Sequence, residues 1–239
     1  PVIGCKCDVC QSSDPRDKRL RTSIMVEMEG KTIVVDTGPD FRQQMLRENV
    51  DQLDAVLFTH EHKDHMAGLD DIRAFNFIQR KEMTVYASDR VQKALKRDYF
   101  YAFEEKKYPG VPQIHLTDLH KEPFEVEGIN IIPIEVMHFK LPVFGFRFGD
   151  FTYITDANYI SRKEKEKIKG SKVMVINALR KTDHISHFTL DEAIELVDEL
   201  DVEEAYITHI SHQMGLHKDV EKETPDNIHL GYDGLKIEI

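Results

Sequence analysis

One heptapeptide of the chain reads Thr-His-Glu-His-Lys-Asp-His and places three imidazoles and a carboxylate within one short segment. It follows Ala55–Phe58, an apolar run typical of a buried strand. His60 and His62 alternate, so in extended chain their rings point to one side, and Asp64 and His65 follow where the chain must turn. Imidazole suits zinc, manganese or iron, and a carboxylate can bridge to a second ion. The heptapeptide therefore predicts a metal site at a strand end.

Three more candidate ligands each follow a run typical of a buried strand: His138, Asp156 and His209. Taken singly, a histidine at a strand end is more often a hydrogen-bonded structural residue, and an aspartate there is more often a turn former. Together with the heptapeptide they make a set of five histidines and two aspartates. That set is the right inventory for two metal ions at the loop ends of strands.

The three cysteines of the chain lie within its first ten residues, as Cys5-Lys-Cys7-Asp-Val-Cys10. An odd number of cysteines crowded at one end is a poor disulfide framework. Thiols this close suit a soft metal, but a closed structural zinc needs four ligands, so the fourth must come from elsewhere. We expect the fourth ligand to be His212, three residues after His209. The alternative is a set of reduced cysteines with no metal.

The elements that must position these residues mix strands and helices. The pattern of apolar residues predicts strands over Ile24–Glu27, Thr32–Val35, Ala55–Phe58, Thr84–Ala87, Ile129–Val136, Val143–Phe148, Phe151–Thr155, Val173–Ile176, Ala205–Thr208 and Leu235–Ile239. Helices are predicted over Phe41–Arg47, Leu69–Arg80, Asp89–Arg97, Ser161–Lys169 and Thr189–Leu200. Two groups of strands with helices between and after them predict an α/β (α+β) fold of two sheets with helices on the outer faces.

Composition excludes several classes of protein. The 239 residues are 41% apolar, enough for one good core or two small ones, and we expect a single domain over residues 1–239. No apolar run approaches the roughly eighteen residues of a membrane span. The net charge of −11 disfavours a nucleic-acid partner, although metal ions can still admit a small anionic substrate. The cysteine usage and the absence of a signal-peptide pattern lead us to expect a cytoplasmic protein.

The order and spacing of these motifs resemble the metallo-β-lactamase superfamily. The match covers the His-x-His-x-Asp-His segment and the later His138, Asp156 and His209, and so spans most of the chain. The resemblance implies an αββα sandwich with two divalent ions, zinc or manganese, in the active site. It implies one ion held by His60, His62 and His138, a second held by Asp64, His65 and His209, and Asp156 as the bridge between them.

An N-terminal Cys-x-Cys-x-x-Cys beside a His-x-x-His resembles, more narrowly, the phosphoribosyl 1,2-cyclic phosphate phosphodiesterases (PhnP-like). In that group a structural zinc is held by three cysteines and the second histidine, which implies Cys5, Cys7, Cys10 and His212 here. Residues 1–21 would then form a zinc-binding loop. Such proteins usually begin with a strand before this loop, so we expect that first strand to be missing from this chain.

The same resemblance implies catalytic roles for Asp64 and His187. His187 precedes the predicted helix at Thr189 and would protonate the leaving oxygen while a hydroxide held between the two metals attacks phosphorus. The role of its neighbour His184 stays open. The basic run Arg16–Arg21 could attract phosphate, but we interpret it as a solvated loop. Four further histidines have no partner pattern and are treated as structural: His115, His120, His217 and His229.

The sequence thus predicts a metal-dependent phosphodiesterase acting on a small cyclic diester, which the resemblance identifies as 5-phosphoribosyl 1,2-cyclic phosphate. The expected partners are this small substrate and a second copy of the chain in a homodimer. We expect no membrane or nucleic-acid partner. Two alternatives stay open. One is a nuclease of the same superfamily that trims tRNA 3′ ends, and the other is a non-catalytic metal-binding module; a β-lactam or thioester hydrolase is disfavoured.

Overall fold

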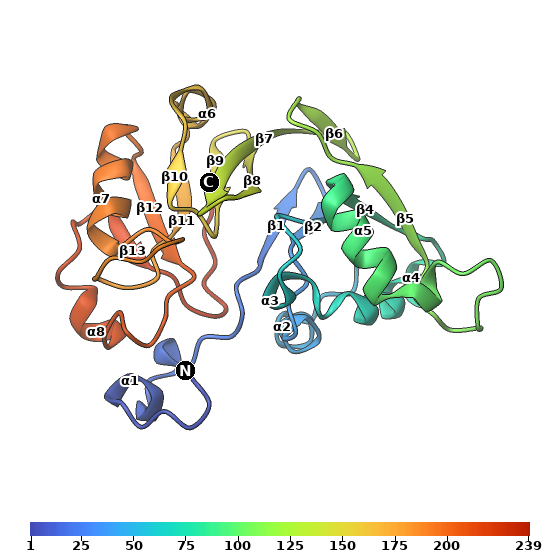
Figure 1. Ribbon diagram of the computed structural model, residues 1–239, viewed down its shortest axis with the longest axis horizontal. Helices are drawn as coiled ribbons and strands as arrows, with labels where there is room; N and C mark the ends of the chain where they lie inside the picture. Colours follow the sequence, from blue (N-terminus) through green and yellow to red (C-terminus); the bar gives the residue numbers. More distant parts are fainter. The chain divides into compact units, whose positions relative to one another are not determined.

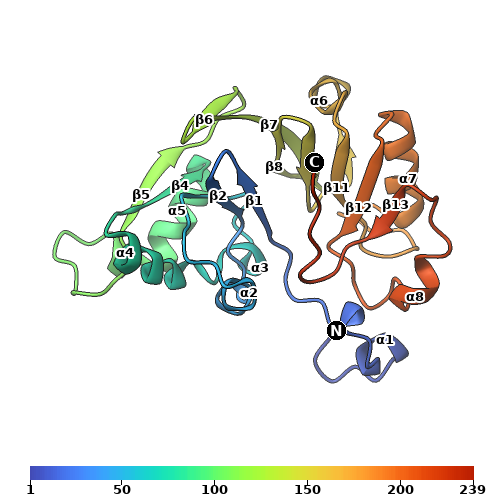
Figure 2. The same cartoon turned by 180° about the vertical axis from the view of Figure 1, so that it is seen from behind.

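The computed structural model describes residues 1–239, which divide into two compact units (Figures 1 and 2). The five-stranded unit comprises Arg21–His120 and Glu125–Ile129, and the eight-stranded unit comprises Pro1–Leu20, Lys121–Phe124 and Asn130–Ile239. Each unit contains its own sheet and its own apolar core. The expected single domain over residues 1–239 stays a prediction beside this division.

The sheet of the five-stranded unit has the order β1-β2-β3-β4-β5. The hairpin of β1 and β2 is antiparallel, and β2 through β5 run parallel to one another. The strands are β1 (Ile24–Met28), β2 (Lys31–Val35), β3 (Ala55–Leu57), β4 (Met83–Ala87) and β5 (Ile114–Asp118). The helices and 3₁₀ turns are α2 (Phe41–Glu48), α3 (Lys63–Met66), η2 (Leu69–Ile72), α4 (Arg73–Gln79), α5 (Asp89–Asp98) and η3 (Phe100–Ala102).

The sheet of the eight-stranded unit has the order β10-β7-β8-β9-β11-β12-β13, with β6 paired to β7. Its strands are β6 (Phe124–Val126), β7 (Ile129–His138), β8 (Leu141–Phe148), β9 (Phe151–Ile154), β10 (Tyr159–Ile160), β11 (Val173–Asn177), β12 (Glu204–Thr208) and β13 (Ile228–Leu230). Its helices and 3₁₀ turn are α1 (Asp8–Gln11), η1 (Pro15–Asp17), α6 (Arg162–Ile168), α7 (Leu190–Glu199) and α8 (His217–Val220). In both views α1 lies beside α8 (Figures 1 and 2).

Apolar periodicity explains how helices cover these sheets. In the five-stranded unit, Val56 and Val85 of the strands share a core with Phe41 of α2 and Leu95 of α5. In the eight-stranded unit, the apolar face of α7 shares a core with β11 and β12. Helix α7 begins with a capping box, in which Thr189 and Glu192 satisfy each other's backbone N–H groups. These contacts hold the strand ends in place, and the strand ends carry the candidate ligands.

Strand direction determines where those ends lie in the larger sheet. Strands β7 and β9 both pair antiparallel with β8, so they point the same way, and β11, β12 and β13 run parallel to β9. The carboxyl ends of β7, β9, β11 and β12 therefore meet at one edge of this sheet. In α/β sheets, binding sites collect outside the carboxyl ends of strands.

The structure confirms the expected class of two mixed sheets flanked by helices, with two local corrections. The predicted strand Leu235–Ile239 is wrong: it belongs to no ladder, and β13 occupies the place beside β12. An alternating pattern shows which side chains are buried, but a strand also needs a neighbouring backbone to pair with. The predicted helix Leu69–Arg80 is instead η2 followed by α4, and Arg80 ends it in the left-handed conformation. No helix combines the length and apolar character that a membrane crossing requires.

Candidate metal centre

The heptapeptide forms a compact group of donors beyond the carboxyl end of β3. The ring of His60 lies 4.5 Å from that of His62 and 4.3 Å from that of His65, centroid to centroid. His60 and His65 are buried, whereas His62 is exposed and Asp64 is half-buried. Helix α3 starts directly after His62 and turns Asp64 and His65 back toward the strand end. The structure thus brings together the four candidate ligands of this unit.

A buried carboxylate, Asp36, supports this group from the end of the neighbouring strand β2. Its Oδ1 accepts the backbone N–H of Thr59 at 2.9 Å, and its Oδ2 accepts the Thr59 hydroxyl at 2.8 Å. The same Oδ2 lies 2.7 Å from Nδ1 of His65. Burial raises the pKa of the Asp36 carboxyl above its ordinary value, while His65 and Thr59 act in the opposite direction.

These contacts determine which ring nitrogens face outward. A carboxylate only accepts hydrogen bonds, so Nδ1 of His65 carries the proton that it donates to Asp36. The Thr59 hydroxyl spends its proton on Asp36, so its oxygen accepts from Nδ1 of His60 at 2.9 Å. In both rings Nε2 is then the atom with the lone pair. Histidines that bind metals usually donate their other N–H to a carboxylate or similar acceptor in this manner.

Close backbone approach brings Asp64 to this position. A Cβ atom on Gly38, in the loop after β2, would lie 2.3 Å from the carbonyl oxygen of Asp64. Only glycine allows the two loops to come this near, and the backbone N–H of Gly68 then donates to Thr37 at 2.8 Å. The loop after β2 therefore holds both ends of α3.

A second group of donors lies at the common edge of β7, β9 and β12 in the eight-stranded unit. Asp156 is its centre: its Oδ1 lies 3.3 Å from Nε2 of His209, 3.6 Å from Nδ1 of His187 and 4.0 Å from Nε2 of His138. The ring of His187 lies 4.6 Å from that of His138 and 4.9 Å from that of His209. The structure thus brings His138, Asp156, His187 and His209 together.

A backbone contact and the backbone conformation of its residues also position the second group. Nδ1 of His138 lies 2.8 Å from the Ser186 carbonyl, which can only accept, so Nε2 of His138 carries the lone pair. Asp156 and His209 both have positive φ, 52° and 53°, and Asp36 in the first group has φ of 66°. Residues other than glycine rarely adopt this backbone conformation. It is found most often at functional sites, where the surrounding structure enforces it.

Burial sets the charge of the two histidines in the loop before α7. It lowers the pKa of His187 to about 3, with Asp156 acting in the opposite direction and the neighbouring histidines adding to the decrease. Burial and the nearby Arg180 also lower the pKa of His184, whose ring lies 5.0 Å from that of His187. The lowered pKa of each ring favours the neutral imidazole at pH 7.

The donor sets fit divalent cations. Nitrogen and carboxylate oxygen donors are those that zinc and manganese accept, and in His60, His65 and His138 the ligand nitrogen is already oriented by a partner on the other nitrogen. Nδ1 of His187 is buried without a hydrogen-bond partner, beside the Asp156 carboxylate. Polar atoms buried in this way are uncommon unless a water or an ion completes them.

A third group lies in the eight-stranded unit and involves the cysteines of the N-terminal segment. The sulfur atoms of Cys5 and Cys7 each lie 3.4 Å from Nδ1 of His212, and with Cys10 the four ligand atoms lie within 4.8 Å of one another. The backbone N–H of Cys10 and then His212 lower the pKa of the Cys7 thiol to about 6. This shift favours the thiolate of Cys7, the form that binds metals.

The structure also places the histidines that were treated as structural. His217 is buried and lies 2.8 Å from the Arg19 guanidinium, and His229 lies 3.3 Å from Glu221. His115 and His120 are exposed, and neither is among the three groups of donors.

Three supporting groups were not anticipated from the sequence: Asp36, Thr59 and the carbonyl of Ser186. A signal for Asp36 existed, because it directly follows the strand β2, much as Asp156 comes two residues after the end of β9. The Thr59 hydroxyl and the Ser186 carbonyl had none, since their role depends on chain segments that meet only in the folded state.

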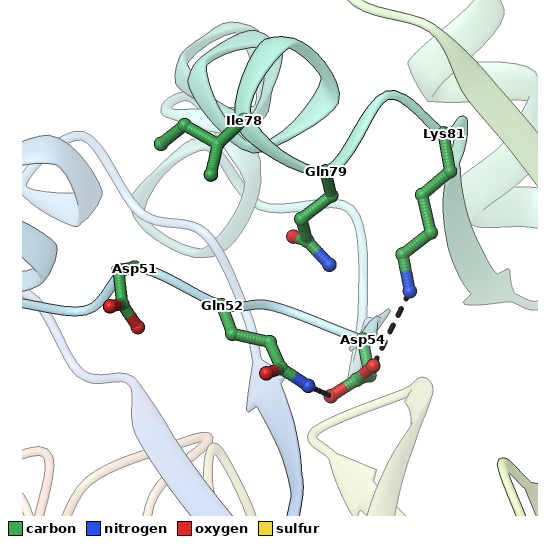
Figure 3. Close-up of a pocket in the computed structure, with 6 residues that line it drawn as sticks. All are labelled: Asp51, Gln52, Asp54, Ile78, Gln79 and Lys81. Atoms are coloured by element: carbon green, nitrogen blue, oxygen red, sulfur yellow. Dashed lines mark hydrogen bonds and ion pairs between the residues drawn. The ribbon is translucent and has the colours of Figure 1, made fainter.

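A pocket of about 440 Å³ in the five-stranded unit lies at the opposite end of β3 (Figure 3). Asp54, which directly precedes β3, is bound there by Gln52 at 2.9 Å and Lys81 at 3.3 Å. Asp54 also accepts the backbone N–H of Thr32 at 3.0 Å. The Asp54 carboxylate is thus already paired, and the pocket lies at the amino ends of the parallel strands. We therefore assign this pocket no role in the chemistry.

Comparison with known proteins identifies the family. A model of the β-lactamase superfamily domain matches residues 31–210. The crystal structure of a diphosphatase from the PhnP family superposes with a TM-score of 0.92 at 38% identity, covering 99% of this chain and 91% of that one.

Two curated relatives carry other names. An octanoyltransferase of Porphyromonas gingivalis is 39% identical over 239 residues, covering 99% of this chain but 48% of its own length. A ribonuclease Z of Nanoarchaeum equitans is 28% identical over 134 residues, covering 53% of this chain and 42% of its own length. The chain thus spans about half the length of the curated relatives it matches.

We expect Asp36→Asn to weaken metal binding by about 10- to 100-fold, because the amide cannot orient both Thr59 and His65 as the carboxylate does. The measurement is a zinc or manganese titration against a competing chelator. Asp71→Asn is the matched control, since that carboxylate only pairs with Arg42 on the surface. Equal metal affinity in Asp36→Asn and the control would show that Asp36 has no role in binding.

Proposed function

The chain belongs to the metallo-β-lactamase superfamily and, within it, to the PhnP family of metal-dependent hydrolases, and from that premise we propose that it hydrolyses a small phosphodiester. The substrate class proposed here includes cyclic diesters, with 5-phosphoribosyl 1,2-cyclic phosphate as the first candidate. It also includes substituted diphosphates, in which a phosphorus atom is bonded to one ester oxygen and one anhydride oxygen.

We propose that the candidate histidines and aspartates are the ligands of two divalent ions. The ligand assignment follows the superfamily pattern. One ion would be held by His60, His62 and His138 and the other by Asp64, His65 and His209, and Asp156 would contribute to both. The observation that carries this proposal is the orientation of His60, His65 and His138, each of which directs its proton to a fixed acceptor and presents Nε2 as a ligand.

When bound, such a pair of cations supplies an activated water nucleophile and neutralises charge on phosphoryl oxygens. The chain itself must then deliver a proton to the departing alkoxide. His187 is the proposed donor, since Asp156 lies on its Nδ1 side and leaves Nε2 to face the substrate. Burial lowers the pKa of this ring, and negative charge brought by the diester acts in the opposite direction and favours the imidazolium.

Two rival functions are less well supported. A ribonuclease of the same superfamily must bind a polyanion, and the net charge of −11 disfavours such a substrate. The relative named octanoyltransferase is a longer protein, and this chain matches only 48% of its length. Acyl transfer through a cysteine nucleophile is not favoured here, because all three thiols are grouped around His212.

The decisive experiment is elemental analysis of protein purified without added metal, followed by a turnover assay. The assay compares 5-phosphoribosyl 1,2-cyclic phosphate, linear diesters, a substituted diphosphate and a precursor tRNA. We expect turnover of a small diester that a chelator abolishes and that zinc or manganese restores. Turnover unaffected by chelation, or cleavage of tRNA alone, would refute the proposal, and full metal content without any turnover would indicate a binding module.

We also propose that Cys5, Cys7, Cys10 and His212 hold a structural zinc. His212→Asn should lower the zinc content by about one ion per chain, because a closed zinc site needs four ligands. It should also speed proteolysis within residues 1–20, which this site would tie to the segment after β12. His115→Asn, at an exposed position on β5, is the control. Unchanged zinc content in His212→Asn would contradict the assignment.

His187→Asn tests the proton donor. We expect kcat to fall by about 10²- to 10⁴-fold for a diester with an alkyl leaving group, and far less for an activated aryl ester that departs without a proton. His184→Asn and His229→Asn are measured in parallel. A loss independent of the leaving group would remove His187 from the acid role, and a leaving-group-dependent loss in His184→Asn would transfer that role to His184.

A further inference from the structure

The basic run at residues 16–21 separates into two kinds of residue. Three of its four cations are used within the eight-stranded unit, where Arg16, Lys18 and Arg19 each bond to a fixed acceptor. Those acceptors are, in the same order, the Asp14 carboxylate at 2.7 Å, the Cys10 carbonyl at 2.7 Å and the Gly231 carbonyl at 2.7 Å. The fourth, Arg21, begins the five-stranded unit and has a different environment.

The backbone of Arg21 is fixed while its side chain is open to solvent. Its N–H donates to Asp40 at 2.8 Å, and its carbonyl accepts from the buried Gln44 at 2.9 Å. The side chain is 61% exposed, and Nη1 lies 3.8 Å from Oδ2 of Asp64. A fixed backbone therefore directs a solvent-exposed guanidinium toward one of the candidate ligands.

The pair with Asp64 is too long and too exposed to explain the placement by stability. Exposed ion pairs contribute little, because water and salt screen them. If Asp64 binds a divalent ion, as proposed above, the ion neutralises its negative charge. The Arg21 guanidinium then loses this carboxylate as its partner and can bind another anion. The other cations beside the heptapeptide are committed elsewhere: Lys63 to Asp98 and Arg90 to Glu61.

We infer that Arg21 binds a second phosphate group of the substrate, one that is not cleaved. This inference rests on the proposed function and specifies its substrate class further. The cleaved diester carries a single negative charge, which the two cations already neutralise, so an arginine beside them is suited to an additional phosphate. The planar guanidinium matches two phosphate oxygens at once, which a lysine in its place would not.

The kinetic test compares 5-phosphoribosyl 1,2-cyclic phosphate with the same cyclic sugar lacking the 5-phosphate, followed by phosphorus NMR. Arg21→Gln should reduce the preference for the phosphorylated sugar, measured as the ratio of the two kcat/KM values, by about 10- to 100-fold. Arg21→Lys should restore it only in part. Arg42→Gln is the matched control, an exposed arginine in the same unit that pairs with Asp71 at 3.9 Å.

A binding measurement separates failure of this inference from failure of the proposed function. Calorimetry with inorganic diphosphate should show about 10- to 100-fold weaker binding to Arg21→Gln than to Arg42→Gln, with metal present. If the wild type hydrolyses neither sugar nor any other small diester or substituted diphosphate, the proposed function fails, and calorimetry alone then decides the role of Arg21. If the preference ratio or the diphosphate affinity of Arg21→Gln matches that of the control, the inference is overturned.

Discussion

The candidate centre depends on one buried carboxylate. Asp36 is inaccessible to solvent, and a charge in that position must be matched by hydrogen bonds or it would be strongly destabilising. It is matched by the backbone and hydroxyl of Thr59 and by the ring of His65, so it determines the position of both ends of the histidine loop. The orientation of His60 follows indirectly, through the Thr59 hydroxyl. One side chain at the end of β2 thus orders two candidate metal ligands on the segment after β3.

The second group of donors depends on strand direction instead of one side chain. Because β7, β9 and β12 all point the same way, His138, Asp156 and His209 leave the sheet at one edge. The left-handed backbone of Asp156 and His209 turns each side chain back toward that edge. Tolerating such conformations costs free energy, and the well-packed core formed by β11, β12 and α7 provides the stability that offsets it.

The N-terminal segment is held to the eight-stranded unit by more than its cysteines. The buried Asp17 accepts the backbone N–H of His217 at 2.8 Å, and Arg19 donates to Gly231 and lies against His217. These charge-assisted hydrogen bonds anchor the segment next to His212, so the thiols of Cys5 and Cys7 are brought to that ring by the fold as well as by any metal. Such an arrangement is pre-organised for a soft cation.

The sequence by itself determined the fold class and both groups of candidate ligands, because those signals are local: apolar runs define strands, and donor residues directly follow them. Only the tertiary structure revealed Asp36, Thr59 and the Ser186 carbonyl as partners of the histidines, since these contacts join segments distant in the sequence. It also separated Arg21 from the rest of its basic run, which the sequence suggested was uniformly solvated. The strand expected over Leu235–Ile239 failed for the same reason. Periodicity describes the faces of a single segment, whereas pairing and orientation depend on which other segment lies beside it.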